Sequence, residues 1–160
     1  LLAAVGAWVP VVWWVLPAWM MARMALNAMD GIIARERGQA TRRGMIFNEL
    51  ADVVSDAALI LPLQVLPGVS SSLVVWVALF ASWTELAGVL GMSFGASRRY
   101  EGPMGKADRA LVLGLLGAYV GLFGTPPPAM SLLLLIALGL LLITVLRRVG
   151  HALAEVEGAA

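Results

Sequence analysis

The 160-residue chain has no cysteine, a single histidine and few charged residues, and these shortages exclude several kinds of site. Without cysteine there are no disulfides and no thiolate-ligated metals. Charged residues make up 13% of the sequence, about half their share in an ordinary soluble domain. The chain is instead 61% hydrophobic, with a mean hydropathy of +0.89 and its apolar residues in long blocks. This composition indicates an integral membrane protein, for which we expect no nucleic-acid partner.

Five apolar segments are long enough to cross a bilayer core of about 30 Å, which predicts an all-α polytopic helix bundle forming one domain over residues 1–160. The segments are 8–33, 45–66, 71–94, 107–123 and 128–148. Prolines should bend the first helix and, at Pro62, kink the second near its end. Because the chain starts at Leu1 rather than Met, we expect an incomplete N-terminus, with residues 1–7 a connector or the end of an earlier span.

The positions of the basic residues predict the topology. Lysine and arginine gather in the connections after the first and third segments and after the last one, whereas the connections 67–70 and 124–127 carry no charge. Arg23 alone lies apart from these clusters. By the positive-inside rule the basic side is cytoplasmic, so the chain begins outside and ends inside a cell inner or plasma membrane.

Several charged residues fall within the predicted spans or at their cytoplasmic ends: Arg23, Asp30, Glu49, Asp52, Asp56 and Glu85. A carboxylate at bilayer depth costs a few kcal/mol, so such residues usually face a cavity and have a function. The alternative is that they merely pair with Arg23 or cap helix ends. The regular spacing of these residues favours a functional site.

The polar residues form two stripes at helical spacing, because positions 27, 30, 31 and 34 share one helix face and positions 44, 48, 52 and 56 share another. The stripes contain oxygen ligands and small residues: Asn27, Asp30, Gly31, Ala34, and then Gly44, Asn48, Asp52, Asp56. The connecting loop is short, so the two helices should be antiparallel and the stripes should converge. Hard oxygen ligands favour Mg²⁺ or Mn²⁺, or else Ca²⁺, and Arg35 adds positive charge. Together they describe a site for a metal-bound di- or triphosphate-like ligand.

These residues resemble the signature of the CDP-alcohol phosphotransferase family, D-x2-D-G-x2-A-R-x8-G-x3-D-x3-D. Six of the eight defined positions match, with every spacing intact. The signature covers less than a fifth of the chain, and the multi-span architecture also fits. Family members have six transmembrane helices and usually form homodimers. The resemblance therefore implies that one N-terminal helix is absent here.

The resemblance implies a metal-dependent enzyme of phospholipid biosynthesis. It would transfer a substituted phosphate group from a CDP-alcohol, such as CDP-diacylglycerol, to an acceptor alcohol and release CMP. The acidic stripe residues would bind one or two Mg²⁺ or Mn²⁺ ions, and Asp52 would also be the general base. Gly31, Ala34 and Gly44 would let the nucleotide lie against the helices, and Arg35 would help to hold the CDP moiety.

Two positions depart from the signature, because Asn27 and Asn48 stand where the family has aspartates. An asparagine carbonyl still binds a hard cation but brings no charge, so the affinity for metal should fall. Asp56, one turn beyond Asp52, would restore one negative charge as a further metal ligand. The alternative is a degenerate homologue that binds a CDP-lipid without turning it over.

The segment 97–110 is a second candidate site on the cytoplasmic side. Its four basic residues are predicted to bind an acceptor phosphate or another anionic group: Arg98, Arg99, Lys106 and Arg109. A lipid-headgroup anchor explains the same loop equally well. His151 lies in a polar tail and is interpreted as solvated. The glycines of the fourth span suit close helix packing, either within the chain or between two copies.

A divalent-cation transporter is a rival hypothesis from another class, because it would also use oxygen ligands inside the membrane. Transport needs a route to the far side, whereas the polar residues here cluster at cytoplasmic depth. The enzyme hypothesis therefore leads. Its partners would be a CDP-alcohol donor, an alcohol acceptor, the lipid bilayer and a second copy of the chain.

Overall fold

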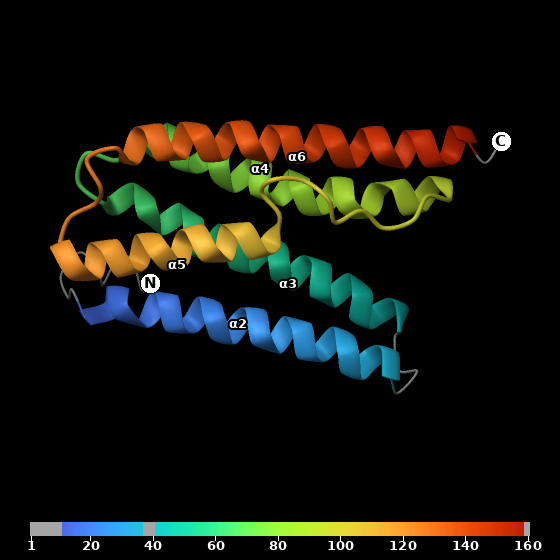
Figure 1. Ribbon diagram of the computed structural model, residues 1–160, viewed down its shortest axis with the longest axis horizontal. Helices are drawn as coiled ribbons and strands as arrows, with labels where there is room; N and C mark the ends of the chain where they lie inside the picture. The colour runs from blue at the N-terminus through green and yellow to red at the C-terminus, as the bar shows by residue number, and fades with distance from the viewer. Residues whose placement is uncertain (1–10, 37–40, 159–160) are drawn as a thin grey trace.

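The structure is a computed structural model that describes the backbone of residues 11–36 and 41–158, together with their side chains except at 11, 12, 27, 28, 30–36 and 42. Within these ranges the chain is all-α, as predicted (Figure 1). The helices are α2 (Val11–Glu36), α3 (Arg42–Ile60), α4 (Ser71–Leu90), α5 (Lys106–Phe123) and α6 (Met130–Gly158), with short 3₁₀ helices η1 (Leu61–Val65) after α3 and η2 (Gly91–Phe94) after α4.

Local sequence explains where several helices begin and end. Thr41 caps α3 by accepting a hydrogen bond from the Gly44 amide at 3.0 Å, which satisfies one amide of the first turn. Ser70 caps α4 in the same way. The predicted kink at Pro62 appears as a change from α-helix to 3₁₀ helix at Leu61. These signals separate the helices at the short connections that the sequence predicts.

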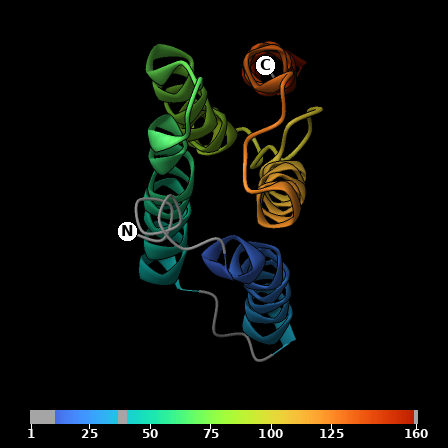
Figure 2. The ribbon, with the colours of Figure 1, turned by 90° about the vertical axis from the view of Figure 1, so that its left-hand side faces the viewer.

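The helices pack mainly as α2 on α5, α3 on α4 and α4 on α6 (Figures 1 and 2). The glycines of α5 lie against α2, where a Cβ added at Gly117 would be 2.9 Å from the Leu16 side chain and one at Gly121 would be 3.1 Å from Trp14. Small residues are thus used for close packing within the chain. The core around this contact includes Trp13, Met20 and Leu113.

The C-terminal helix is longer than the sequence predicts. The last segment was expected to end at residue 148 and be followed by a polar tail, but α6 continues to Gly158 and includes His151. Its extra turns present Ala152, which lies 2.8 Å from where a Cβ of Gly91 would be. Packing against the end of α4 and η2 therefore stabilises α6 beyond Arg147 and Arg148, where the sequence predicts that the helix ends.

Two of the described helices are long and apolar enough to cross a membrane, Ser71–Phe94 and Met130–Gly158. The other helices carry the charges of the candidate sites, which lower their mean hydropathy. Over residues 11–36 and 41–158 the all-α architecture with five long helices is confirmed, whereas membrane crossing by all five helices stays a prediction.

The connection between α4 and α5 folds back along α6 before α5 begins (Figure 1). The buried Arg148 side chain holds it there, because its guanidinium donates to the carbonyl oxygens of Tyr100 and Glu101 in the connection and to that of Thr84 in α4. The Met104 amide donates to Thr144 Oγ1 at 3.0 Å. This fixed connection determines where α5, and with it Lys106, begins.

Gly102 lets the connection pass over α6, because its φ is +128° and an added Cβ would lie 2.5 Å from Thr144 Cγ2. We expect Gly102→Ala to destabilise the protein by about 2–4 kcal/mol through backbone strain and overpacking. Thermal unfolding in detergent should show a clear fall in Tm. Gly139→Ala, which adds a methyl to open space on α6, should change Tm little. Equal effects of the two changes would contradict this account.

Candidate functional site

Asp52 and Asp56 lie one turn apart on the buried face of α3 and form the centre of the site. Their relative exposures are 3% and 1%, in a bundle where ionised groups require partners. The partners come from α2 and α5, which approach this face of α3 with long cationic side chains. Two of the sequence-predicted site residues are thus placed together.

Asp52 contacts two cationic side chains. Lys106, the first residue of α5, donates to Asp52 Oδ2. Arg23 of α2 approaches Asp52 Oδ1 at 3.5 Å. Asp52 therefore lies where three helices meet, next to an ammonium group that a phosphate oxygen of a ligand could also contact.

Asp56 is bound by two arginines. Arg23 donates to Asp56 Oδ1 at 2.9 Å, and Arg109 donates through Nε to Asp56 Oδ2 at 2.8 Å. Arg109 is itself buried and also donates to Thr84 Oγ1, Glu85 Oε1 and the Met104 carbonyl. These contacts join α2, α3, α4 and α5 through one polar network.

The second cationic anchor of this network is Arg148. It is 3% exposed, and its guanidinium lies 4.0 Å from Glu85 while it holds the connection before α5. Pairing of the carboxylates with Arg23 is the alternative that the sequence leaves open, and in the structure Arg23 does pair with Asp52 and Asp56. The partner of Glu85 is instead Arg109, which the sequence does not predict. Arg148 is predicted to follow the last span, with no partner. The separations of 24 to 64 residues between these partners carry no local signal.

The four basic residues of the segment 97–110 divide into two groups. Lys106 and Arg109 pair with Asp52 and Asp56, as described above, whereas Arg98 and Arg99 pair with carboxylates outside this cluster. Arg98 pairs with Glu49 and lies over the Tyr100 ring, 4.5 Å from its centroid. Arg99 pairs with Glu155 and donates to the His151 carbonyl at 2.9 Å. The structure therefore does not bring all four cations to one point.

The exposed part of this segment is held against α6 by a contact between Glu101 and His151. Glu101 Oε1 and His151 Nδ1 are 2.9 Å apart, so the histidine has a partner although its side chain is exposed. Burial raises the pKa of Glu101, but hydrogen bonds from the Glu101 and Tyr100 amides and from His151 outweigh it, and the pKa lies below its usual range. Glu101 thus acts as an anionic anchor for the connection.

None of the side chains of the α2 stripe is among those that the structure describes. Asn27, Asp30, Gly31, Ala34 and Arg35 lie in α2, whose backbone is helical to Glu36, but their side chains are outside the described residues. Arg23 of α2 reaches both Asp52 and Asp56, so α2 runs beside the face of α3 that carries these carboxylates.

The donor types match a hard divalent cation, although each oxygen of Asp52 and Asp56 contacts a cationic side chain in this structure. Asp52 and Asp56 supply carboxylate oxygens, and Asn48, exposed on the same helix, supplies an amide oxygen. Among the described side chains no three acidic or histidine residues gather as metal ligands. A metal here would thus need a ligand from the part of α2 whose side chains are not described, where Asp30 lies.

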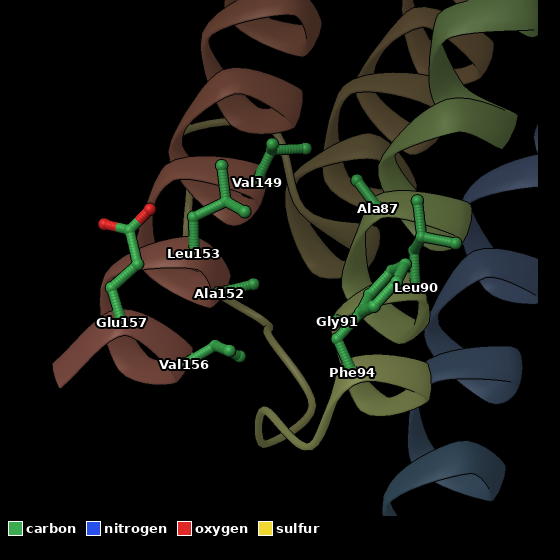
Figure 3. A pocket seen from close by; sticks show the side chains of 9 residues that line it. All are labelled: Ala87, Leu90, Gly91, Phe94, Val149, Ala152, Leu153, Val156 and Glu157. Atoms are coloured by element: carbon green, nitrogen blue, oxygen red, sulfur yellow. The ribbon is translucent and has the colours of Figure 1, made fainter. Parts of the chain in front are cut away.

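A separate groove of about 270 Å³ lies between the end of α4, η2 and α6 (Figure 3). Apolar side chains such as Leu90, Phe94 and Leu153 line it, and Glu157 is its one charged lining residue. It contains none of the sequence-predicted site residues. The groove has no cationic group for a phosphorylated ligand, which separates it from the carboxylate site.

Comparison with known proteins agrees with the signature. The chain is 44% identical over 139 residues to Inner membrane protein YnbA of Escherichia coli (strain K12), an alignment that covers 87% of this chain and 69% of the relative. No solved structure shows a significant match. Residues 1–157 match the model of the CDP-alcohol phosphatidyltransferase family, and the chain therefore belongs to this family.

Proposed function

We propose that the chain catalyses metal-dependent transfer of a substituted phosphate group from a CDP-alcohol to an acceptor alcohol, with release of CMP. The observation that carries the proposal is the position of Asp52, buried on the signature stripe with Lys106 and Arg23 beside it. Family membership and the intact D-G-x2-A-R run support it.

In the proposed reaction the acceptor hydroxyl oxygen bonds to the β-phosphorus, the bond from that phosphorus to the bridging oxygen breaks, and CMP leaves. Asp52 accepts the hydroxyl proton. Lys106 touches Asp52, so it is placed to bind a phosphate oxygen of a substrate beside the base. Arg35, Gly31, Ala34 and Gly44 would bind the CDP moiety as in the family signature.

A divalent ion would be held by the stripe residues Asn27, Asp30, Asn48, Asp52 and Asp56. When bound, Mg²⁺ or Mn²⁺ would neutralise the pyrophosphate and the departing CMP. Of the basic segment, Lys106 is the cation nearest to this reaction, whereas Arg98 and Arg99 are paired with Glu49 and Glu155. A role for Arg98 and Arg99 in binding an acceptor phosphate would require them to exchange these partners.

The proposed location is a cell membrane, with all five helices crossing it and the carboxylate site open to the cytoplasm. Leucines of α5 and α6 that face outward, such as Leu111, Leu115 and Leu146, would contact lipid. One lipid substrate would then reach Asp52 laterally from the bilayer. The relative named as an inner membrane protein supports this location, and a homodimer is part of the same proposal.

We expect Asp52→Asn to lower CMP release by at least about a hundredfold, because a general base contributes that much or more. Purified protein in detergent would receive Mg²⁺, CDP-diacylglycerol or a soluble CDP-alcohol, and pooled acceptor alcohols. Glu157→Gln, which neutralises an exposed carboxylate on α6, is the matched control and should keep its activity. Similar Tm values would exclude unfolding as the cause.

The alternative of a degenerate homologue gives a different result in the same assay. Folded wild-type protein that binds a CDP-lipid but releases no more CMP than Asp52→Asn, with every metal and acceptor, would contradict the proposed activity. The reason would then be the loss of charge at Asn27 and Asn48.

Restoring one of those charges gives a second prediction. Asn48→Asp should lower the Mg²⁺ concentration for half-maximal activity by about tenfold, since a carboxylate is a stronger ligand of a hard cation than an amide. Mg²⁺ titrations of CMP release would measure it. Asn48→Ala should raise that concentration instead, and no change in either variant would remove Asn48 from the metal site.

A further inference from the structure

We infer that Arg23 is a built-in cation of the carboxylate cluster, so that the site takes one divalent ion and not two. The inference rests on the proposed function, because it concerns the metal requirement of the same site. Arg23 is no part of the family signature, and it lies one turn before Asn27 on the same stripe of α2.

The position of the guanidinium is the first argument. Arg23 bridges both carboxylates of α3, at 2.9 Å to Asp56 and 3.5 Å to Asp52, and its side chain is only 11% exposed. A guanidinium buried against two carboxylates is held by strong charge-assisted hydrogen bonds. It also reaches Asp52 from α2, the helix on which the signature has an aspartate at position 27.

The charges give the second argument. In the described part of the network three carboxylates, Asp52, Asp56 and Glu85, are contacted by three cations. Those cations are Arg23, Lys106 and Arg109. These three carboxylates and three cations already balance each other before any metal binds, and Arg148, 4.0 Å from Glu85, gives the network one positive charge in excess.

The departures from the signature agree with this balance. Asparagine at positions 27 and 48 removes two negative charges, which equals the charge of one divalent ion. Of the acidic residues on the α2 stripe only Asp30 remains. Asp30 and the donor pyrophosphate together can neutralise one divalent ion, but a second ion would be left beside Arg23 without compensating charge.

Asp56 has a different role under this inference. Its two oxygens are bound by Arg23 and Arg109, so its negative charge is matched within the protein. Asp56 would hold Arg23 in position, and Asn27, Asp30, Asn48 and Asp52 would hold the ion. Arg23 thus acts on the metal site as a fixed positive charge.

The test is the number of Mn²⁺ ions bound per chain, measured by electron paramagnetic resonance of free Mn²⁺ during titration of the purified protein in detergent. The expected count is one for the wild type. Two ions per wild-type chain, or none at millimolar Mn²⁺, would overturn the inference. This count is independent of any variant and of turnover.

Variants of Arg23 test the charge directly. Arg23→Gln should tighten Mn²⁺ binding by about tenfold or more, because it removes a positive charge beside the ion. Arg23→Lys keeps the charge and should bind Mn²⁺ like the wild type. Arg147→Gln, at an exposed arginine of α6, makes the same charge change elsewhere and should leave the affinity unchanged. Unchanged affinity in Arg23→Gln would overturn the inference.

The CMP assay separates this inference from the proposed function. CMP release from a protein that binds two Mn²⁺ ions would leave the function in place and remove the role of Arg23. One bound Mn²⁺ ion together with no CMP release from any donor would support the role of Arg23 and contradict the proposed function.

Discussion

The placement of buried charge organises this protein. Three carboxylates and four basic side chains meet among α2, α3, α4, α5 and α6, and all but Arg23 and Lys106 are buried from water. Removing one member of such a group leaves its partner unpaired at a cost of several kcal/mol. The helices are consequently tied to one mutual arrangement by charges that packing alone would not require. The same arrangement puts Asp52 beside Lys106, which is the geometry that the proposed chemistry needs.

The fold could be predicted largely from local sequence. Long apolar blocks separated by short polar or proline-containing connections placed five helices, and caps such as Thr41 and Ser70 set two of their starts. The extension of α6 was missed because Arg147 and Arg148 look like the end of a span. Ala152 and the apolar residues after it continue the packed face, and their partner Gly91 is distant in sequence.

The candidate site, like the fold, could be predicted only in part from the sequence. Helical periodicity brought Asp52 and Asp56 onto one face, which the structure confirms. Which cations would pair with them was not predictable, because Arg109 is 53 residues from Asp56 and Lys106 is 54 from Asp52. The basic segment read as one anion site, yet the fold sends Arg99 to α6 and Lys106 to α3. Tertiary packing determines which cation meets which carboxylate, and the spacing of residues along the sequence does not predict it.

The glycine contacts between α5 and α2 have a consequence for chemistry at some distance. Leu16 and Trp14 fit against Gly117 and Gly121, where a Cβ would collide, so α2 has one preferred axial position along α5. A slip of one helical turn would displace Arg23 by about 5.4 Å and separate it from Asp56. The spacing of the ionic groups around Arg23 therefore depends on apolar contacts nearer the start of the same helix. A change in those contacts would therefore also change the electrostatics of the site.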